Sequence, residues 1–135
     1  MEPPPATPLN VPPGAVHMSF AGTPRCIADA REGTSAFLHR HARLADHTFH
    51  YDVLLVVSEL VTNSVRYASG PLTLELSLVP GGVKVAVRDS NPTPPRLRSP
   101  DLTGGHGWSI VQRLCRRVRV LPLHDGKAVH AELAW

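Results

Sequence analysis

Four short segments with alternating apolar residues occur in two pairs, and this pairing restricts the possible folds more than any other feature of the sequence. The pairs are residues 72–79 with 83–89 and residues 118–121 with 128–133. Pro80-Gly81-Gly82 separates the first pair, and a turn at His124-Asp125-Gly126 joins the second. Short glycine-containing connections between β-rich segments predict β-hairpins, whose strands are antiparallel. Residues 17–20 alternate over a shorter length, as an edge strand does.

Three further segments have apolar residues at the three- and four-residue spacing of amphipathic helices. They cover about residues 24–44, 52–68 and 107–117. Thr23 followed by Pro24 is a typical helix start, and Asp52 is a good N-cap for the second helix. In the first helix the apolar stripe runs to Leu44, and Gly33 is a weak position. The second helix is so rich in valine and leucine that we expect much of its circumference to be covered.

The order of these elements predicts the fold class. Because the strands come in hairpins, the helices have to share one face of the sheet. We therefore expect an α+β protein, a two-layer α/β sandwich with three helices on one face of a mostly antiparallel sheet. A doubly wound nucleotide-binding fold needs single helices between parallel strands, so the pattern argues against it.

Length and composition restrict the class of protein further. The chain has 135 residues, of which 42% are hydrophobic, enough for one domain at residues 16–135. Residues 1–15 contain six prolines and little that can pack, so we expect a disordered, proline-rich tail. A net charge of only +3 gives no reason to expect a nucleic-acid surface. Neither a signal peptide nor an apolar span is recognisable, so we expect a cytoplasmic protein that does not bind membranes.

Polar residues in the middle of the second helix form the first candidate site. Glu59 and Asn63 are four positions apart and project from one face, and Arg66 lies one turn further along it. A carboxylate and an amide within an apolar helix are costly to desolvate unless a polar partner meets them. Hydrated Mg²⁺ with a phosphate would be such a partner. The alternative, which the spacing alone favours, is that these residues are simply the solvated face of the helix.

Two further candidates lie at the end of the first hairpin and before the third helix. Asp89 ends an apolar strand and can accept a hydrogen bond from the exocyclic amine of adenine, although Asp-Ser-Asn is also ordinary turn chemistry. Gly104-Gly105-His106-Gly107 opens the third helix, where closely spaced glycines let the backbone approach a phosphate, although glycines also form turns. Neither a P-loop nor a GxGxxG fingerprint is present.

The three candidates together, in this order, resemble the motifs of the ATPases that include gyrase, histidine kinases and MutL. Glu59 to Asn63 is similar to the N box, Asp89 to the aspartate of the first glycine box, and Gly105-x-Gly107 to the second glycine box. The short chain and the residues Ser58-Glu59-Leu60-Val61-Thr62-Asn63 are most similar to the stand-alone anti-sigma-factor serine kinases of bacteria. The resemblance covers about residues 16–135 and implies the Bergerat-type ATP-binding fold.

The resemblance also implies a role for each site residue. Asn63 matches a Mg²⁺ ligand, Glu59 a general base, and Asp89 the residue that hydrogen-bonds adenine. Trp108 packs under a lid or borders the nucleotide. The further residues expected to border the nucleotide are Arg66, Asn91, Gly104, Gly105 and Gly107.

The resemblance implies that residues 91–104 form a lid over the phosphates, with Gly105 and Gly107 allowing it to close. Three positions depart from the family pattern: Asn91 and Ser109 stand where glycines are usual, and Tyr67 stands where histidine is frequent. Asn91 is a mild change, because asparagine tolerates left-handed backbone geometry. These departures leave ATP binding as the expectation and bear mainly on phosphoryl transfer.

The functional prediction is an ATP- and Mg²⁺-dependent serine protein kinase that binds and phosphorylates an antagonist protein, with Glu59 polarising the substrate hydroxyl. The resemblance implies a sigma factor, an anti-sigma-factor antagonist or both as partners, and often a homodimer. One alternative is a non-catalytic anti-sigma-like module in which nucleotide only orders the lid and a partner-binding surface on the first helix. Another is a vestigial nucleotide site, which predicts that Mg-ATP does not stabilise the fold.

Overall fold

The structure is a computed structural model that describes residues 14–68, 70–94 and 107–135. The strands are β1 (Ala15–Phe20), β2 (Leu72–Val79), β3 (Gly82–Asp89), β4 (Arg117–Leu123) and β5 (Gly126–Ala134). The helices are α1 (Arg25–His41), α2 (His47–Tyr67) and α3 (Gly107–Leu114). Residues 1–13 of the predicted tail lie outside the described residues, and Ala15, which we assigned to that tail, already belongs to β1.

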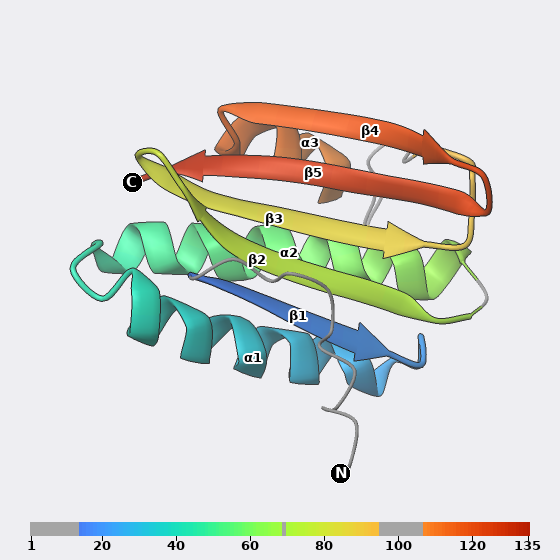
Figure 1. Ribbon diagram of the computed structural model, residues 1–135, viewed down its shortest axis with the longest axis horizontal. Coiled ribbons are helices and arrows are strands. Elements are labelled where there is room, and N and C mark those ends of the chain that lie inside the picture. The colour runs from blue at the N-terminus through green and yellow to red at the C-terminus, as the bar shows by residue number, and fades with distance from the viewer. Residues whose placement is uncertain (1–13, 69, 95–106) are drawn as a thin grey trace, which may run out of the picture.

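Within the described residues, the strands form one sheet in the order β1-β2-β3-β5-β4, and every neighbouring pair is antiparallel. The two hairpins, β2-β3 and β4-β5, meet where β3 pairs with β5. Figure 1 shows the helices on one side of this sheet, with α2 behind its central strands. The structure therefore confirms the predicted two-layer α+β sandwich.

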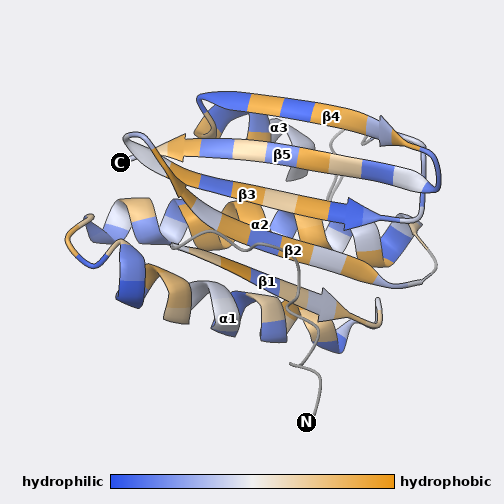
Figure 2. Ribbon diagram, in the orientation of Figure 1, coloured by the Kyte–Doolittle hydropathy of each residue, from blue (hydrophilic) through white to orange (hydrophobic). Residues whose placement is uncertain are grey.

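The core lies between the two layers, where alternate residues of each strand face the helices. In Figure 2 the strands change repeatedly between hydrophobic and hydrophilic positions, as expected for a sheet with one covered face. On β2 the core positions are Leu72, Leu74 and Leu76, each at most 1% exposed. The other face of the sheet carries polar side chains such as Lys84 and Glu132, which are opposite each other on β3 and β5.

Helix α2 is the centre of the helical layer. It contacts α1 on one side, α3 on the other, and β3 and β5 beneath it, as its richness in valine and leucine predicted. Its buried residues are Phe49, Val53, Val56, Val57, Leu60, Val61 and Ser64. None of the helices in the described ranges has the length and apolarity needed to cross a membrane.

The predicted start of α2 was wrong by five residues. Asp46, rather than Asp52, is the N-cap: its backbone is extended, and its Oδ1 accepts a hydrogen bond from the N–H of Phe49 at 2.8 Å. The first turn after Asp46 is mostly polar, and only Phe49 in it is buried, so the apolar pattern did not reveal it. Asp52 lies inside the helix.

The predicted helices α1 and α3 also extended about three residues too far at their C-terminal ends. Ala42 leaves the helical conformation, and Leu44 is 97% exposed in the connection to α2 rather than part of the apolar stripe. At the start of α1, Pro24 takes the N-cap position in place of Thr23 and supplies no side-chain cap. Helix α3 ends at Leu114, because the chain enters β4 at Arg117.

Gly33, a weak position for helix propensity, has a packing reason. A Cβ at this residue would overlap Sδ of Met18, so the absence of a side chain lets α1 lie close to β1. The local cost of glycine in a helix is therefore offset by closer contact between the two elements.

The capping assignment is tested by two aspartate substitutions in the same helix. Asp46→Ala should lower the free energy of unfolding by about 1 kcal/mol, because the Phe49 N–H loses its acceptor. Asp52→Ala should change it by less than about 0.5 kcal/mol. Urea titration of both variants measures the difference, and a larger loss for Asp52→Ala would contradict the assignment.

Candidate functional site

Three elements meet around the side chain of Asp89. Asp89 is the last residue of β3, Lys127 is opposite it on β5, and Ser64 reaches it from the last two turns of α2. The side chains of Asp89 and Lys127 are each only 2% exposed. Helix, central strand and neighbouring strand are thus tied together at one end of the molecule by buried polar groups.

The Asp89 carboxylate accepts hydrogen bonds on both oxygens. Lys127 Nζ lies 3.0 Å from Oδ1 and 3.1 Å from Oδ2. The hydroxyl of Ser64 donates to Oδ2 at 2.6 Å, and the backbone N–H of Asn91 donates to Oδ1 at 3.0 Å. A buried carboxylate needs this degree of compensation, because an uncompensated charge in the interior is strongly destabilising.

Asn91 links this network to the end of α2. Its side-chain N–H donates to the carbonyl of Tyr67 at 2.7 Å, which satisfies one of the last helix carbonyls. Its Oδ1 accepts from the N–H of Thr93 at 3.0 Å, and its carbonyl accepts from Lys127 Nζ at 3.0 Å. The chain beyond β3 therefore leaves the sheet through two successive aspartate- and asparagine-stabilised turns.

A second group forms where α2 contacts the first residue of α3. A Cβ on Gly107 would overlap Oε2 of Glu59 and lie 3.2 Å from its Cδ, so in this conformation the carboxylate lies directly against the first residue of α3. Asn63 lies one turn further along α2 and is partly buried. Neither Glu59 nor Asn63 makes a side-chain hydrogen bond to another described residue. Both polar groups are therefore available to a ligand.

The remaining predicted site residues are less closely associated with these two groups. Arg66 is exposed on α2, and Trp108 packs against the hydrophobic core from the first turn of α3. Gly104, Gly105 and residues 95–104 of the predicted lid lie outside the described residues.

Sequence reasoning missed two residues of the site as partners of Asp89. Ser64 follows Val57 and Leu60 on the buried stripe of α2, at the spacing of one helical turn. Lys127 has the same parity as the core residues Val129 and Ala131 of β5. A lysine at an inward position of a strand indicates a buried partner, so the period-two pattern contained the signal.

Thiol chemistry does not belong to this site. Burial raises the pKa of the Cys115 thiol to about 12, and the carboxylate of Asp52 adds to the shift. Burial also raises the pKa of Cys26. Because the thiolate is the reactive form, both cysteines are poor nucleophiles at neutral pH.

The two groups differ in how well they fit Mg-ATP. The carboxylate of Glu59 and the amide of Asn63 supply hard oxygen donors, and Gly107 gives close access to the start of α3, where unpaired N–H groups suit a phosphate. The Asp89 carboxylate instead has its acceptor positions filled by Lys127, Ser64 and Asn91. Glu59, Asn63 and the start of α3 therefore fit Mg²⁺ and phosphate, whereas Asp89 offers no free oxygen to the amine of an adenine.

Comparisons with known proteins concern the family and the fold of the chain. The model of the histidine kinase-like ATPase domain family matches residues 20–132. No curated protein matches the chain.

Several solved structures share the fold. The RsbU and RsbW domains of a Mycobacterium tuberculosis protein superimpose with a TM-score of 0.69 at 18% identity, covering 91% of this chain and 33% of that one. The histidine kinase domain of a blue-light activated histidine kinase from Erythrobacter litoralis gives 0.51 at 21% identity, covering 75% and 60%. The Acinetobacter baumannii histidine kinase AdeS gives 0.50 at 14%, covering 88% and 67%. At these identities the likeness concerns the fold alone.

The buried ion pair predicts that Lys127→Met and Arg88→Met lower the free energy of unfolding by very different amounts. Lys127→Met keeps most of the volume but leaves the Asp89 carboxylate without its cation, so the free energy of unfolding should fall by about 3–5 kcal/mol. Arg88→Met removes an ion pair with Asp125 whose side chains are 56% and 69% exposed, and should cost about 0–1 kcal/mol. Denaturant titration compares them, and equal losses would show that the buried pair is not a structural anchor.

Proposed function

The chain belongs to the histidine kinase-like ATPase domain family, and from this premise we propose that it is an ATP- and Mg²⁺-dependent protein kinase that phosphorylates a serine of a regulatory protein partner. The observation that carries the proposal is the contact between Glu59 and Gly107, with Asn63 one turn along α2. This contact brings an acid, an amide and a helix start to one place on the surface of α2.

Each residue has a distinct part in the proposed reaction. Asn63 offers its side-chain oxygen to Mg²⁺, which supplies charge neutralisation for the phosphates when bound. The first N–H groups of α3, beginning at Gly107, donate to phosphate oxygens. Glu59 lies within the same group, where it accepts the proton of an incoming hydroxyl. The protein thus contributes positioning and charge stabilisation.

The proposed transfer conserves atoms and charge. The serine oxygen of the partner attacks the γ-phosphorus, the bond between this phosphorus and the β,γ-bridging oxygen breaks, and ADP leaves. The serine proton passes to Glu59, which releases it to solvent after product departure. Because Glu59 is partly buried against Gly107, its carboxylate is held in place without a hydrogen-bonded partner among the described residues.

The nature of the partner is proposed from the resemblance of residues 58–63 to the anti-sigma-factor serine kinases, which supports a regulatory protein as the substrate. We propose that this partner is an antagonist of an anti-sigma factor, that the chain itself holds a sigma factor, and that both encounters take place in the cytoplasm, with the chain acting as a homodimer.

A second candidate is a nucleotide-dependent binding module without transferase activity, which is supported by Asn91 and Ser109 at positions where the family usually has glycines. Such a module binds its partner when nucleotide is present and forms no phosphorylated product. The two candidates share the phosphate group site at Glu59, Asn63 and Gly107, so phosphoserine formation separates them.

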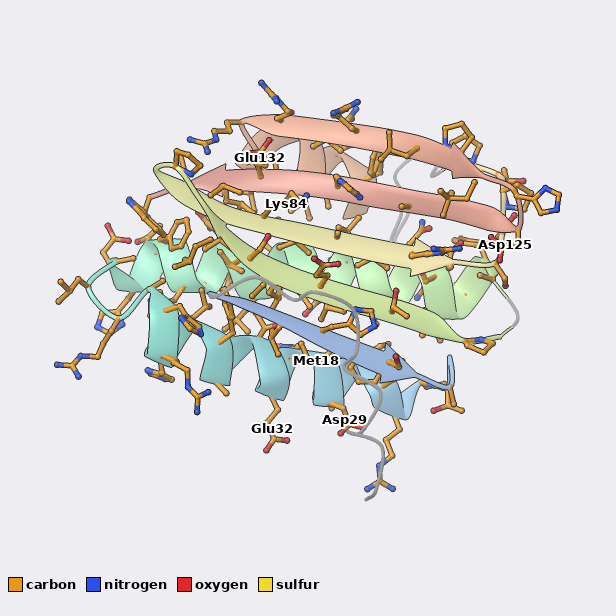
Figure 3. The ribbon with its side chains drawn as sticks, viewed as in Figure 1. Met18, Asp29, Glu32, Lys84, Asp125 and Glu132 are labelled. Carbon is orange, nitrogen blue, oxygen red and sulfur yellow. The ribbon has the colours of Figure 1, made fainter. Side chains whose placement is uncertain are left out.

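The catalytic proposal predicts that Glu59→Gln abolishes phosphoserine formation on a candidate antagonist protein while Mg-ATP binding is retained, because the amide does not accept the proton. The loss should be at least about a hundredfold in rate. Labelled ATP and phosphoamino-acid analysis measure it. Glu32→Gln is a matched control, since Figure 3 shows Glu32 on α1, directed away from the sheet. Transfer by Glu59→Gln at the parent rate would refute this role.

The cation-binding proposal predicts that Mg-ATP raises the melting temperature of the parent but not of Asn63→Ala, because the variant lacks the amide oxygen. Stabilisation by a ligand at a hundred times its dissociation constant is about 2.7 kcal/mol, enough to measure by thermal shift. Thr62→Ala, the adjacent position of α2, should respond like the parent. Equal stabilisation of Asn63→Ala would place the ligand elsewhere.

A further inference from the structure

The acceptor capacity of the Asp89 carboxylate is full within the protein itself. Each carboxylate oxygen accepts about two hydrogen bonds. Oδ1 receives one from Lys127 and one from the Asn91 N–H, and Oδ2 receives one from Lys127 and one from Ser64. An additional donor, such as the exocyclic amine of a purine, finds no free lone pair on this side chain.

Lys127 is equally satisfied and equally inaccessible. Its ammonium group has three N–H bonds and three acceptors, namely the two oxygens of Asp89 and the carbonyl of Asn91, all within 3.0–3.1 Å. Its side chain is 2% exposed, as is that of Asp89. A base amine therefore has to displace a buried, fully hydrogen-bonded cation before it reaches the carboxylate.

The exchange is unfavourable for a neutral amine. The pair between Lys127 and Asp89 is charged on both sides, whereas an amine on adenine carries no charge, and charge-assisted hydrogen bonds are about twice as strong as neutral ones. Displacing the lysine also leaves a buried ammonium group to be solvated elsewhere. On these grounds the contact between Asp89 and Lys127 should be retained when a nucleotide occupies the phosphate group site.

We propose that Lys127 is a specificity-determining residue of the nucleotide site: it takes the place of the base amine on Asp89, so the site binds purine nucleoside triphosphates through their phosphates and discriminates little at position six of the base. This inference rests on the proposed function, because it concerns the nucleotide that the same site uses. According to this inference, the chain recognises the triphosphate group of its nucleotide more strongly than the identity of the base.

The test measures the affinities of the parent for Mg-ATP and Mg-ITP by calorimetry. The two nucleotides differ at position six, where the amine donor of adenine is replaced by a carbonyl, and at the neighbouring N1, which carries a proton only in ITP. We expect the dissociation constants of the parent to agree within about threefold. Lys127→Thr, which frees Asp89, should prefer ATP by about tenfold or more, the value of one hydrogen bond to a charged acceptor.

Three further variants make the test specific. Lys127→Arg keeps a cation on Asp89 and should retain the low selectivity of the parent. Lys84→Thr is the matched control. Lys84 lies on β3, on the face of the sheet away from the helices, so its replacement should also leave the selectivity unchanged. Lys127→Met is a second variant that frees Asp89, and if neither variant folds, the comparison of Mg-ATP with Mg-ITP on the parent decides the inference.

Two results overturn the inference and leave the proposed function intact. One is a parent protein that binds Mg-ATP at least tenfold more tightly than Mg-ITP. This result can be observed without any variant. The other is a freed Asp89, in Lys127→Thr or Lys127→Met, with the selectivity of the parent. Absence of binding of either nucleotide to the parent and to all Lys127 variants overturns both proposals. Binding of Mg-ATP by Lys127→Thr but not by the parent also overturns the inference, because the parent then does not hold the triphosphate through its phosphates with Lys127 in place.

Discussion

The contact between Asp89 and Lys127 is the interaction on which the arrangement of the site depends. Two opposite charges at 3.0 Å, both buried, hold the end of β3 to the start of β5, and the Ser64 hydroxyl adds α2 to the same point. Such a pair contributes little net stability compared with apolar residues of the same volume, but breaking one side of it is costly. Its effect is therefore mainly geometric, because it admits one alignment of helix and strands.

This constraint divides the site into two unlike halves. Near Gly107, the carboxylate of Glu59 and the amide of Asn63 have no side-chain partners among the described residues. Around Asp89, every oxygen of the carboxylate is already used. The hydrogen bonds of the Asp89 group are thus made within the protein, whereas the polar groups of Glu59 and Asn63 are not paired with side chains in the part of the chain that the structure describes. This arrangement is expected where a ligand is held by one of its ends. The charged end of a nucleotide suits the open half, because hydrated cations and phosphates need polar groups that the protein has not yet paired.

The fold could be predicted from the sequence because its signals are local. The bounds of β2 were predicted correctly, since Pro71 and Pro80 mark both ends, and the turn at Gly126 was recognised from its residue types. The start of α2 was not, because its first turn after Asp46 is polar. The contact between Asp89 and Lys127 depends on a non-local fact, namely that β5 lies between β3 and β4. Two hairpins alone do not specify which of their strands meet, so the partner of Asp89 required the structure.

The strand order also has a consequence for synthesis. β5 follows every other described element along the chain, yet it is an interior strand, and β4 reaches the rest of the sheet only through it. On the ribosome, β1, β2 and β3 can pair as soon as they emerge, but the edge of β3 stays open and Asp89 lacks its lysine until β5 is available. β5, which is made after the other described strands, therefore closes the core and brings Lys127 to Asp89 in the same step, so the candidate site is incomplete until this strand has paired.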